Sequence, residues 1–352
     1  MLVKPDSPQI NWLGAVSLQK EDGFVRPWRL VHNDFDLFYA PGLQNACGMT
    51  SGVRMTFRTD ATKIKLKLQH QSEHYVVASA NGTMLELPHC LFDIFVDGEK
   101  FTTISLADDD DFLSFGNLPA GMHDIEIWFP THSTLKIYEL QLQSATKLEA
   151  IKDERPRWVV YGSSITHCVR AETPSLTWPA IVANEFDWNL TSLGLGGQCK
   201  IEDSMAKMIR DLPADILTLK LGINTYTSDL SPRTFPTAVI GMIRTIREKH
   251  ETTPLVICSP IISPPRETTP SVSGQTLVQM RDDIVKIVNI FRQRGDKNIY
   301  YIGGLEIFGE ELLKYMPDQL HPDANGIKVM AQNFIREIKK LKIKGVINES
   351  IN

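Results

Sequence analysis

Hydrophobic and polar residues alternate along much of the first 150 positions, which is typical of β-strands with one buried and one solvent-facing side. In residues 63–68 each lysine is followed by Ile or Leu, so one side of this strand would be charged and the other buried. Further runs of strand character are residues 92–96, 101–106, 123–128 and 135–142. Asp97-Gly98 joins two of them and favours a tight hairpin turn. With no convincing long helix, residues 1–151 are predicted to form an all-β sandwich of jelly-roll type.

The pattern changes after residues 152–157, a charged segment that contains a proline. Short apolar runs, typical of strands buried on both sides, now alternate with segments whose apolar residues recur at helical spacing. The predicted strands are residues 158–161, about 188–192, 216–221, 255–258 and 299–302, and the helical stripes fall in residues 239–246, 280–291 and 327–338. This alternation predicts an α/β domain over residues 152–352, with a parallel sheet covered by helices on both faces. Ligands of such sheets bind at the carboxyl ends of the strands.

Composition narrows the classes of function. The 352 residues suit about two domains, and a net charge of −5 argues against a broad nucleic-acid-binding surface and against a polybasic membrane surface. No stretch approaches the ~20 apolar residues of a membrane-spanning helix, and the first residues show no secretory pattern, so the expected location is cytoplasmic. The five cysteines are widely spaced without a Cys-x-x-Cys pair, which favours reduced thiols over disulfides or a structural zinc site.

A glycine-led turn follows the first strand of the α/β half. In Gly162-Ser163-Ser164-Ile165-Thr166 the turn can present a hydroxyl group with backbone N–H groups beside it. Serine and threonine also commonly cap helices, so an N-cap explains the same residues without any chemistry.

A second motif lies far downstream, in Asp318-Gln319-Leu320-His321-Pro322. A carboxylate on one ring nitrogen fixes the tautomer of a histidine, so that its other nitrogen can take a proton. Asp318 can supply that carboxylate to His321 within one loop. A polar loop that caps the following helix is the alternative.

Two further strand ends carry candidate hydrogen-bond donors. Glycines in Gly196-Gly197 can make a simple turn or offer an N–H to a developing oxyanion. Asn224, in Gly222-Ile223-Asn224, can close a turn or donate from its side-chain amide.

Taken together and in this order, the four motifs resemble the SGNH, or GDSL, hydrolase family over roughly residues 157–342. The resemblance implies a flavodoxin-like three-layer domain with Ser164 as nucleophile, His321 as base and Asp318 orienting His321. It implies an oxyanion hole made by the Ser164 N–H, the Gly197 N–H and the Asn224 side chain. No metal or cofactor is implied. Ser163 stands where the family's name motif has Asp, and Thr225 where Asp often follows the Asn, which indicates a divergent branch.

The resemblance favours a serine esterase that hydrolyses small acyl esters, acetyl esters above all, on small molecules or carbohydrates through an acyl-enzyme. An acyltransferase with the same triad, or a carbohydrate-binding protein with an idle hydrolase domain, are the alternatives. An α/β-hydrolase elbow fits less well, because Thr166 stands at its last glycine position. The first domain suits a carbohydrate-binding module or a structural contact, and a homo-oligomer is left open.

Several other residues could bind a metal or line the pocket, but a purely structural role explains them as well or better. His70 and His74 have the spacing of metal ligands on a helix, but they follow an alternating strand. Residues 108–111, four aspartates, lack the spaced ligands of a calcium loop and suit a solvated turn. Trp178 is expected in the core. The remaining candidates lie near the motifs, where they can line the pocket or simply pack: His167, Cys168, Cys199 and the proline-rich loop 259–267.

Overall fold

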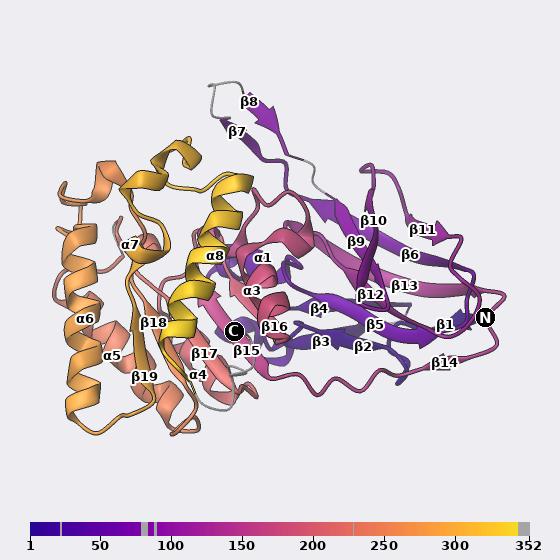
Figure 1. The fold of residues 1–352 in the computed structure, drawn as a ribbon, viewed down its shortest axis with the longest axis horizontal. Coiled ribbons are helices and arrows are strands. Elements are labelled where there is room, and N and C mark those ends of the chain that lie inside the picture. The colour runs from indigo at the N-terminus through magenta and orange to yellow at the C-terminus, as the bar shows by residue number, and fades with distance from the viewer. Residues whose placement is uncertain (22, 79–83, 88–89, 228, 344–352) are drawn as a thin grey trace.

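Alternating burial in the N-terminal half builds two antiparallel sheets that pack face to face around one hydrophobic core. The computed structural model describes residues 1–352 except 22, 79–83, 88–89, 228 and 344–352 (Figure 1). In strand β6 (Lys63–Ser72), Ile64, Leu66 and Leu68 are at most 1% exposed and line this core. The predicted hairpin is confirmed, since Asp97 and Gly98 both adopt positive φ between β9 and β10.

The strands of the sandwich are described by their order in each sheet. The first sheet runs β11 (Phe112–Gly116), β6, β13 (Ser133–Gln143), β4 (Phe24–Trp28) and β3 (Ser17–Glu21), with β1 (Leu2–Val3) paired to β13. The second runs β10 (Glu99–Ser105), β9 (Leu91–Val96), β12 (His123–Trp128), β5 (Arg54–Thr59) and β14 (Leu148–Glu149), with β2 (Asn11–Leu13) paired to β5. A separate pair is formed by β7 (Val76–Ala78) and β8 (Met84–Glu86).

One helix of this half was not predicted. The helix α1 (Pro41–Gly48) contains a proline and two glycines, which lower its helix propensity. The proline occupies the first helical position, where its missing N–H costs nothing. Leu43, Ala46 and Cys47 are buried against residues of the C-terminal half. Tertiary packing rather than propensity therefore sets this helix.

The C-terminal half is a five-stranded parallel sheet. Its order is β16 (Asn189–Gly194), β15 (Arg157–Gly162), β17 (Ile216–Lys220), β18 (Leu255–Cys258) and β19 (Ile299–Ile302). This is the flavodoxin-like arrangement, in which the first two strands along the chain exchange places. The predicted fold class is confirmed. The boundary between residues 151 and 152 stays a prediction.

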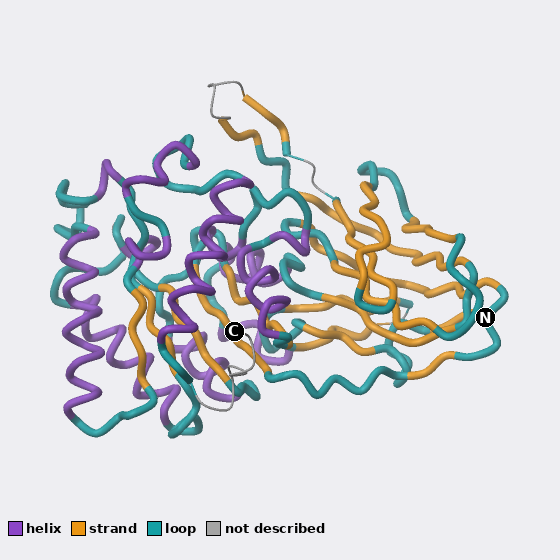
Figure 2. Tube along the Cα trace, viewed as in Figure 1, coloured by secondary structure: helices purple, strands orange, loops and turns teal. Residues whose placement is uncertain are grey.

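Helices cover both faces of the parallel sheet, while the sandwich is almost entirely strand and loop (Figure 2). One face carries α4 (Asp203–Asp211), α5 (Thr234–Arg247) and α6 (Leu277–Gln293). The other carries α2 (Ser164–His167), α3 (Trp178–Phe186), α7 (Gly304–Ile307) and α8 (Ala324–Lys340). Short 3-10 turns are η1 (His32–Leu37), η2 (Pro174–Leu176), η3 (Ile223–Thr225), η4 (Pro264–Arg266) and η5 (Glu310–Tyr315). Within the described residues, no helix is long and apolar enough to cross a membrane.

The N-terminal domain covers the free edge of β16. The N–H groups of Asn189 and Leu195 donate to the Pro156 and Gly162 carbonyls on the β15 side. Since successive residues of a strand face opposite edges, the carbonyls of residues 190, 192 and 194 point away from β15. An unpaired strand edge of this kind needs partners from elsewhere in the chain.

Two buried arginines of the N-terminal domain supply those partners. Arg29 donates to the carbonyls of Ser192 at 3.2 Å and Gly194 at 2.7 Å, and Arg54 donates to the Leu190 carbonyl at 3.0 Å. Burial lowers the pKa of each guanidinium to about 10, so both remain charged at neutral pH. The two arginines thus take the place of a sixth strand.

Candidate active site

Ser164 lies at the turn between β15 and α2. Ser163 is the N-cap of α2, because its hydroxyl accepts a hydrogen bond from the Ile165 N–H at 3.3 Å. The capping interpretation therefore applies to Ser163 and leaves the Ser164 hydroxyl to another partner. The helix approaches β16 so closely that a Cβ added to Gly194 would stand 2.3 Å from the backbone nitrogen of His167.

The Ser164 hydroxyl contacts the histidine of the downstream motif. Ser164 Oγ lies 2.8 Å from His321 Nε2, although the two residues are 157 positions apart in sequence. His321 Nδ1 lies 2.8 Å from Asp318 Oδ2. A carboxylate only accepts hydrogen bonds, so Nδ1 carries the proton and Nε2 is free to accept from the serine. The structure therefore brings the three predicted triad residues together.

Asp318 is fixed by three kinds of donor. Its Oδ1 accepts from the backbone N–H groups of Leu320 at 3.0 Å and His321 at 2.7 Å. Its Oδ2 also accepts from Arg170 Nη2 at 2.8 Å, a contact that the sequence did not predict. Burial alone would raise the pKa of Asp318, but the hydrogen bonds from the ring and backbone of His321 and the positive charge of Arg170 lower it below its ordinary value. The carboxylate is therefore ionised at neutral pH.

The predicted oxyanion donors come from the ends of three neighbouring strands. Residues 195–198, called here the oxyanion turn, follow β16 and close with a bond from the Gln198 N–H to the Leu195 carbonyl at 3.1 Å. Gly197 adopts a φ of +70°, which favours glycine at this position. The Cys199 N–H donates to Asn224 Oδ1 at 3.0 Å, so the amide oxygen is occupied and the amide nitrogen remains to donate.

In the part of the chain that the structure describes, no protein acceptor binds the Ser164 N–H, the Gly197 N–H or the Asn224 side-chain nitrogen. Bonds between segments hold them at one edge of the sheet, because Leu195 is tied to Gly162 and Cys199 to Asn224. Uncommitted N–H donors of this kind are what a developing oxyanion requires, and their role in an oxyanion hole stays a prediction.

The other residues near the motifs are packed. Trp178 is fully buried, which confirms its place in the core. His167 is 1% exposed, and its ring bonds to backbone groups rather than lining an open pocket. Burial raises the pKa of Cys168 and Cys199 to about 12, so both thiols stay protonated. All five cysteines are free thiols.

The proline-rich loop after β18 supports the loop that carries Asp318 and His321. The Ser263 hydroxyl donates to the Gln319 carbonyl at 2.7 Å. Glu267, in the same loop, accepts from Arg281 of α6 at 2.7 Å. The role of this loop, residues 259–267, in shaping substrate access stays a prediction.

The histidines and aspartates considered in the sequence as metal ligands are not arranged to share a metal ion in the described residues. His70 lies within β6, so the helical spacing to His74 does not form. His74 contacts Glu86 at 2.9 Å and Asp108 at 3.4 Å. Residues 108–111 form an exposed turn between β10 and β11. Among the described residues, no group of three or more His, Cys, Asp or Glu side chains is arranged to hold a metal ion.

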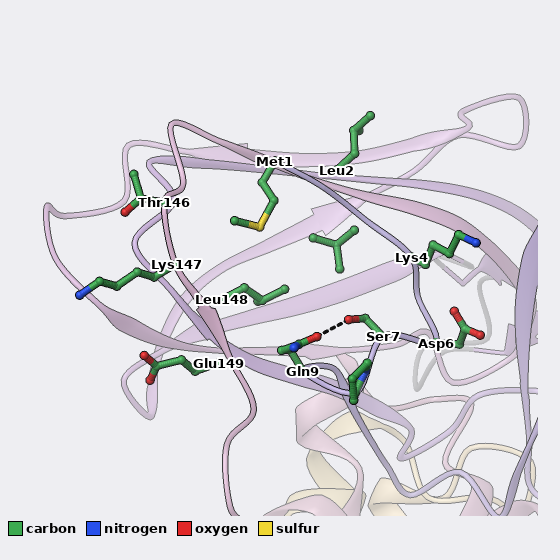
Figure 3. Close-up of a pocket in the computed structure, with 12 residues that line it drawn as sticks. Met1, Leu2, Lys4, Asp6, Ser7, Gln9, Thr146, Lys147, Leu148 and Glu149 are labelled. Carbon is green, nitrogen blue, oxygen red and sulfur yellow. Dashed lines mark hydrogen bonds between the residues drawn. The ribbon is translucent and has the colours of Figure 1, made fainter.

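A pocket of about 810 Å³ lies on the sandwich, between the N-terminal segment and β14 (Figure 3). Its lining residues come from positions 1–9 and 146–149 and include none of the triad. None of them carries an aromatic ring, which is the side chain on which sugar rings stack. This pocket therefore does not explain a carbohydrate-binding role.

Comparison with known families agrees with the geometry. Residues 155–339, slightly more than half of the chain, match the model of the GDSL-like lipase/acylhydrolase family. The chain belongs to this family. Residues 10–137 match a second model, the SsfX3 N-terminal domain. A comparison with curated protein sequences finds no match.

Several solved structures are similar over nearly the whole GDSL protein. A salicylyl-acyltransferase, SsfX3, from a tetracycline biosynthetic pathway is 32% identical, with a TM-score of 0.88 and 98% of each chain covered. A family two carbohydrate esterase from Clostridium thermocellum, in complex with cellohexaose, is 15% identical, with a TM-score of 0.67 and coverage of 94% of this chain and 98% of that one. An acetyl xylan esterase from the rumen bacterium Butyrivibrio proteoclasticus is 10% identical, with a TM-score of 0.62 and coverage of 97% and 98%. The last two show the fold alone.

Proposed function

We propose that this GDSL protein is a serine esterase that hydrolyses small acyl esters through an acyl-enzyme on Ser164. The observation that carries the proposal is the chain of contacts from Ser164 Oγ through His321 to Asp318, each at 2.8 Å.

In the first step Ser164 Oγ attacks the ester carbonyl while His321 Nε2 takes its proton. Asp318 accepts from Nδ1–H and stabilises the imidazolium that forms. The carbonyl oxygen becomes an anion and receives hydrogen bonds from the Ser164 N–H, the Gly197 N–H and the Asn224 amide. His321 then protonates the leaving alcohol. In the second step water, deprotonated by the same nitrogen, attacks the acyl carbonyl, and His321 returns that proton to Ser164 Oγ as the acid leaves.

Two features support an alcohol half as large as a sugar. The side chains of Asp318 and His321 are 30% and 28% exposed, so the reaction centre opens toward solvent. Tyr39 is 90% exposed just before α1, and a Cβ added to Gly42 of α1 would lie 2.7 Å from the Gln198 side chain of the oxyanion turn. An exposed aromatic ring just before the helix that lies against the oxyanion turn suits stacking against a pyranose.

A fluorophosphonate probe tests the assignment without a known substrate. We expect the wild-type protein to be labelled on Ser164 and Ser164→Ala to lose both labelling and ester hydrolysis while it folds normally. Cys168 and Ser163 provide the control, since a label on either neighbour would show that the hydroxyl of Ser164 is not the activated group. A folded wild-type protein without any label would support an idle domain and would end the proposal.

Acyl transfer to an alcohol is the second candidate. It is favoured by the 32% identity to the salicylyl-acyltransferase, which extends over 98% of both chains. The ratio of products separates the two reactions. With p-nitrophenyl acetate and an added alcohol, hydrolysis releases equal amounts of nitrophenol and acetate, whereas transfer releases more nitrophenol than acetate and produces a new ester.

A further inference from the structure

The ring of His167 connects the oxyanion turn to the N-terminal domain. The Gly196 N–H, in that turn, donates to His167 Nδ1 at 3.3 Å. On the other side of the ring, His167 Nε2 lies 2.6 Å from the carbonyl of Thr131, which follows β12 of the sandwich. His167 itself ends α2, the helix that begins with Ser164.

These two partners determine the tautomer of the ring. A backbone N–H can only donate, so Nδ1 of His167 must be an unprotonated acceptor. A backbone carbonyl can only accept, so Nε2 must carry the hydrogen. Burial, followed by the nearby positive charge of Arg29, lowers the pKa of His167 to about 3, which agrees with a ring that stays neutral.

The N-terminal domain reaches the same region at further points. Arg29 donates to the carbonyl of Gly194, two residues before Gly196. The Ser51 hydroxyl donates to the backbone carbonyl of His167 at 2.9 Å. The peptide groups before the oxyanion turn and the helix beside it are therefore both held from the sandwich.

We propose that His167 is a positioning residue that transmits the rigidity of the N-terminal domain to the Gly197 N–H of the oxyanion hole. The domain then serves as a structural part of the reaction centre. The inference rests on the proposed function, because it assigns a task to the oxyanion turn. Its physical basis is that a donor stabilises a transition state only when it is already aimed at the developing charge.

Two substitutions separate the two bonds of the ring. In His167→Asn, the amide oxygen can occupy the position of Nδ1 and accept from Gly196, while the bond to Thr131 is lost. In His167→Gln, the amide nitrogen can reach Thr131, while the Gly196 N–H loses its acceptor. With p-nitrophenyl acetate, we expect kcat of His167→Gln to fall by about 10- to 100-fold with little change in KM, the scale of a small misplacement in a reaction centre. His167→Asn should lose less, about three- to tenfold, because it keeps the bond to the turn and loses the bond to the N-terminal domain. A His167→Asn protein as fast as the wild type would show that the bond to Thr131 plays no part and would overturn the inference.

Ser51→Ala is the matched control, because it removes a bond to the same residue at the same interface without touching the ring. Its kcat should stay within about threefold of the wild type, because the ring keeps both of its bonds and Arg29 still holds Gly194. Second-order rates of fluorophosphonate labelling should follow the same order, since the phosphonyl oxygen occupies the oxyanion hole. Equal losses in His167→Gln and His167→Asn, or an unchanged kcat in His167→Gln, would show a role in packing alone and overturn the inference.

If His167→Gln does not fold, the wild-type protein still decides the question by ¹⁵N NMR of its histidine rings. A ring at position 167 that is protonated on Nε2 and does not titrate between pH 4.5 and 8 supports the inference, whereas the Nδ1–H form or a titrating ring overturns it. Failure of the proposed function is recognised separately, because the wild-type Ser164 would then not be labelled at all.

Discussion

The neutral ring of His167 should make the protein acid-sensitive, and the size of the effect can be worked out. Its ordinary pKa of 6.5, which applies in the unfolded chain, is lowered to about 3 in the folded protein by burial and by the charge of Arg29. As the pH falls below 6.5, His167 becomes protonated in the unfolded chain but stays neutral in the folded protein. The free energy of unfolding must therefore fall with pH.

The magnitude at pH 4.5 depends mainly on the unfolded chain. The folded pKa lies well below pH 4.5, so almost no folded protein is protonated there, and the loss is set by the two units between 6.5 and 4.5. At ~1.36 kcal/mol per unit, His167 should cost about 2.5 kcal/mol of stability between pH 7 and pH 4.5. This stability is fully present above pH 6.5 and disappears as the pH falls toward 3.

Urea unfolding of the wild type and His167→Asn at pH 7.0 and 4.5 isolates this contribution, because every other titrating group is common to both. The wild type should lose about 2.5 kcal/mol more than the variant on acidification. Ser51→Ala keeps the ring and should show the full wild-type loss. If the wild type and His167→Asn lose the same amount, the folded ring is protonated at pH 4.5, and the bond from Gly196 to Nδ1 is absent at that pH.

Substitutions at three further residues test the site and the domain interface. Asn224→Ala should lower kcat for p-nitrophenyl acetate by about 10²–10³ with little change in KM. Asn224→Asp should be as slow, because it keeps the acceptor for the Cys199 N–H but lacks the donor. An effect on KM alone would assign Asn224 to substrate binding. Arg170→Met should lower kcat about tenfold, because Asp318 loses a donor that holds its carboxylate. The kcat of Arg170→Lys should fall between that of Arg170→Met and that of the wild type. Equal rates in all three proteins would show that Arg170 does not position Asp318. Arg29→Met should lower the free energy of unfolding by about 3 kcal/mol in urea titrations, because it leaves the Ser192 and Gly194 carbonyls without donors. A loss below ~1 kcal/mol would mean that water donates hydrogen bonds to these carbonyls instead.

The parts of the fold that the sequence predicts are those with a local signature. The alternation in β6 and the Asp97-Gly98 turn follow from period-two burial and from positive φ, both of which are written in consecutive residues. The helix α1 has no such signature. Its proline and glycines argue against a helix, and it is stabilised by tertiary contacts, because Leu43, Ala46 and Cys47 are buried in a cluster that includes residues of the C-terminal half.

The triad was predictable for a related reason. Asp318 and His321 form one short motif, and Ser164 follows a strand whose carboxyl end must lie at the binding edge of a parallel sheet. Arg170 has no pattern of its own, because its partner Asp318 is 148 positions away. The sequence therefore indicates the reacting groups and misses one that positions them.

The residues that join the two domains were missed because their partners are backbone groups. Arg29 donates to four carbonyls, those of Ala46, Met49, Ser192 and Gly194, and every residue has a carbonyl. His167 likewise bonds only to a backbone N–H and a backbone carbonyl through its ring. In both cases the type of side chain at the partner position does not indicate that a bond will form. For His167 the sequence therefore cannot decide between lining the pocket and packing in the interior.

The position of these contacts places part of the sandwich against β16, the strand that leads into the oxyanion turn. β16 is the edge strand next to β15, and its last residue, Gly194, leads directly into the oxyanion turn. Edge strands have bonds on one side only and open more readily than central ones. A turn that continues such a strand would inherit its mobility, and the Gly197 N–H would then lose its fixed direction. By binding the free carbonyls with Arg29 and Arg54, the N-terminal domain gives β16 the support of a central strand at the point where the proposed chemistry needs a rigid donor.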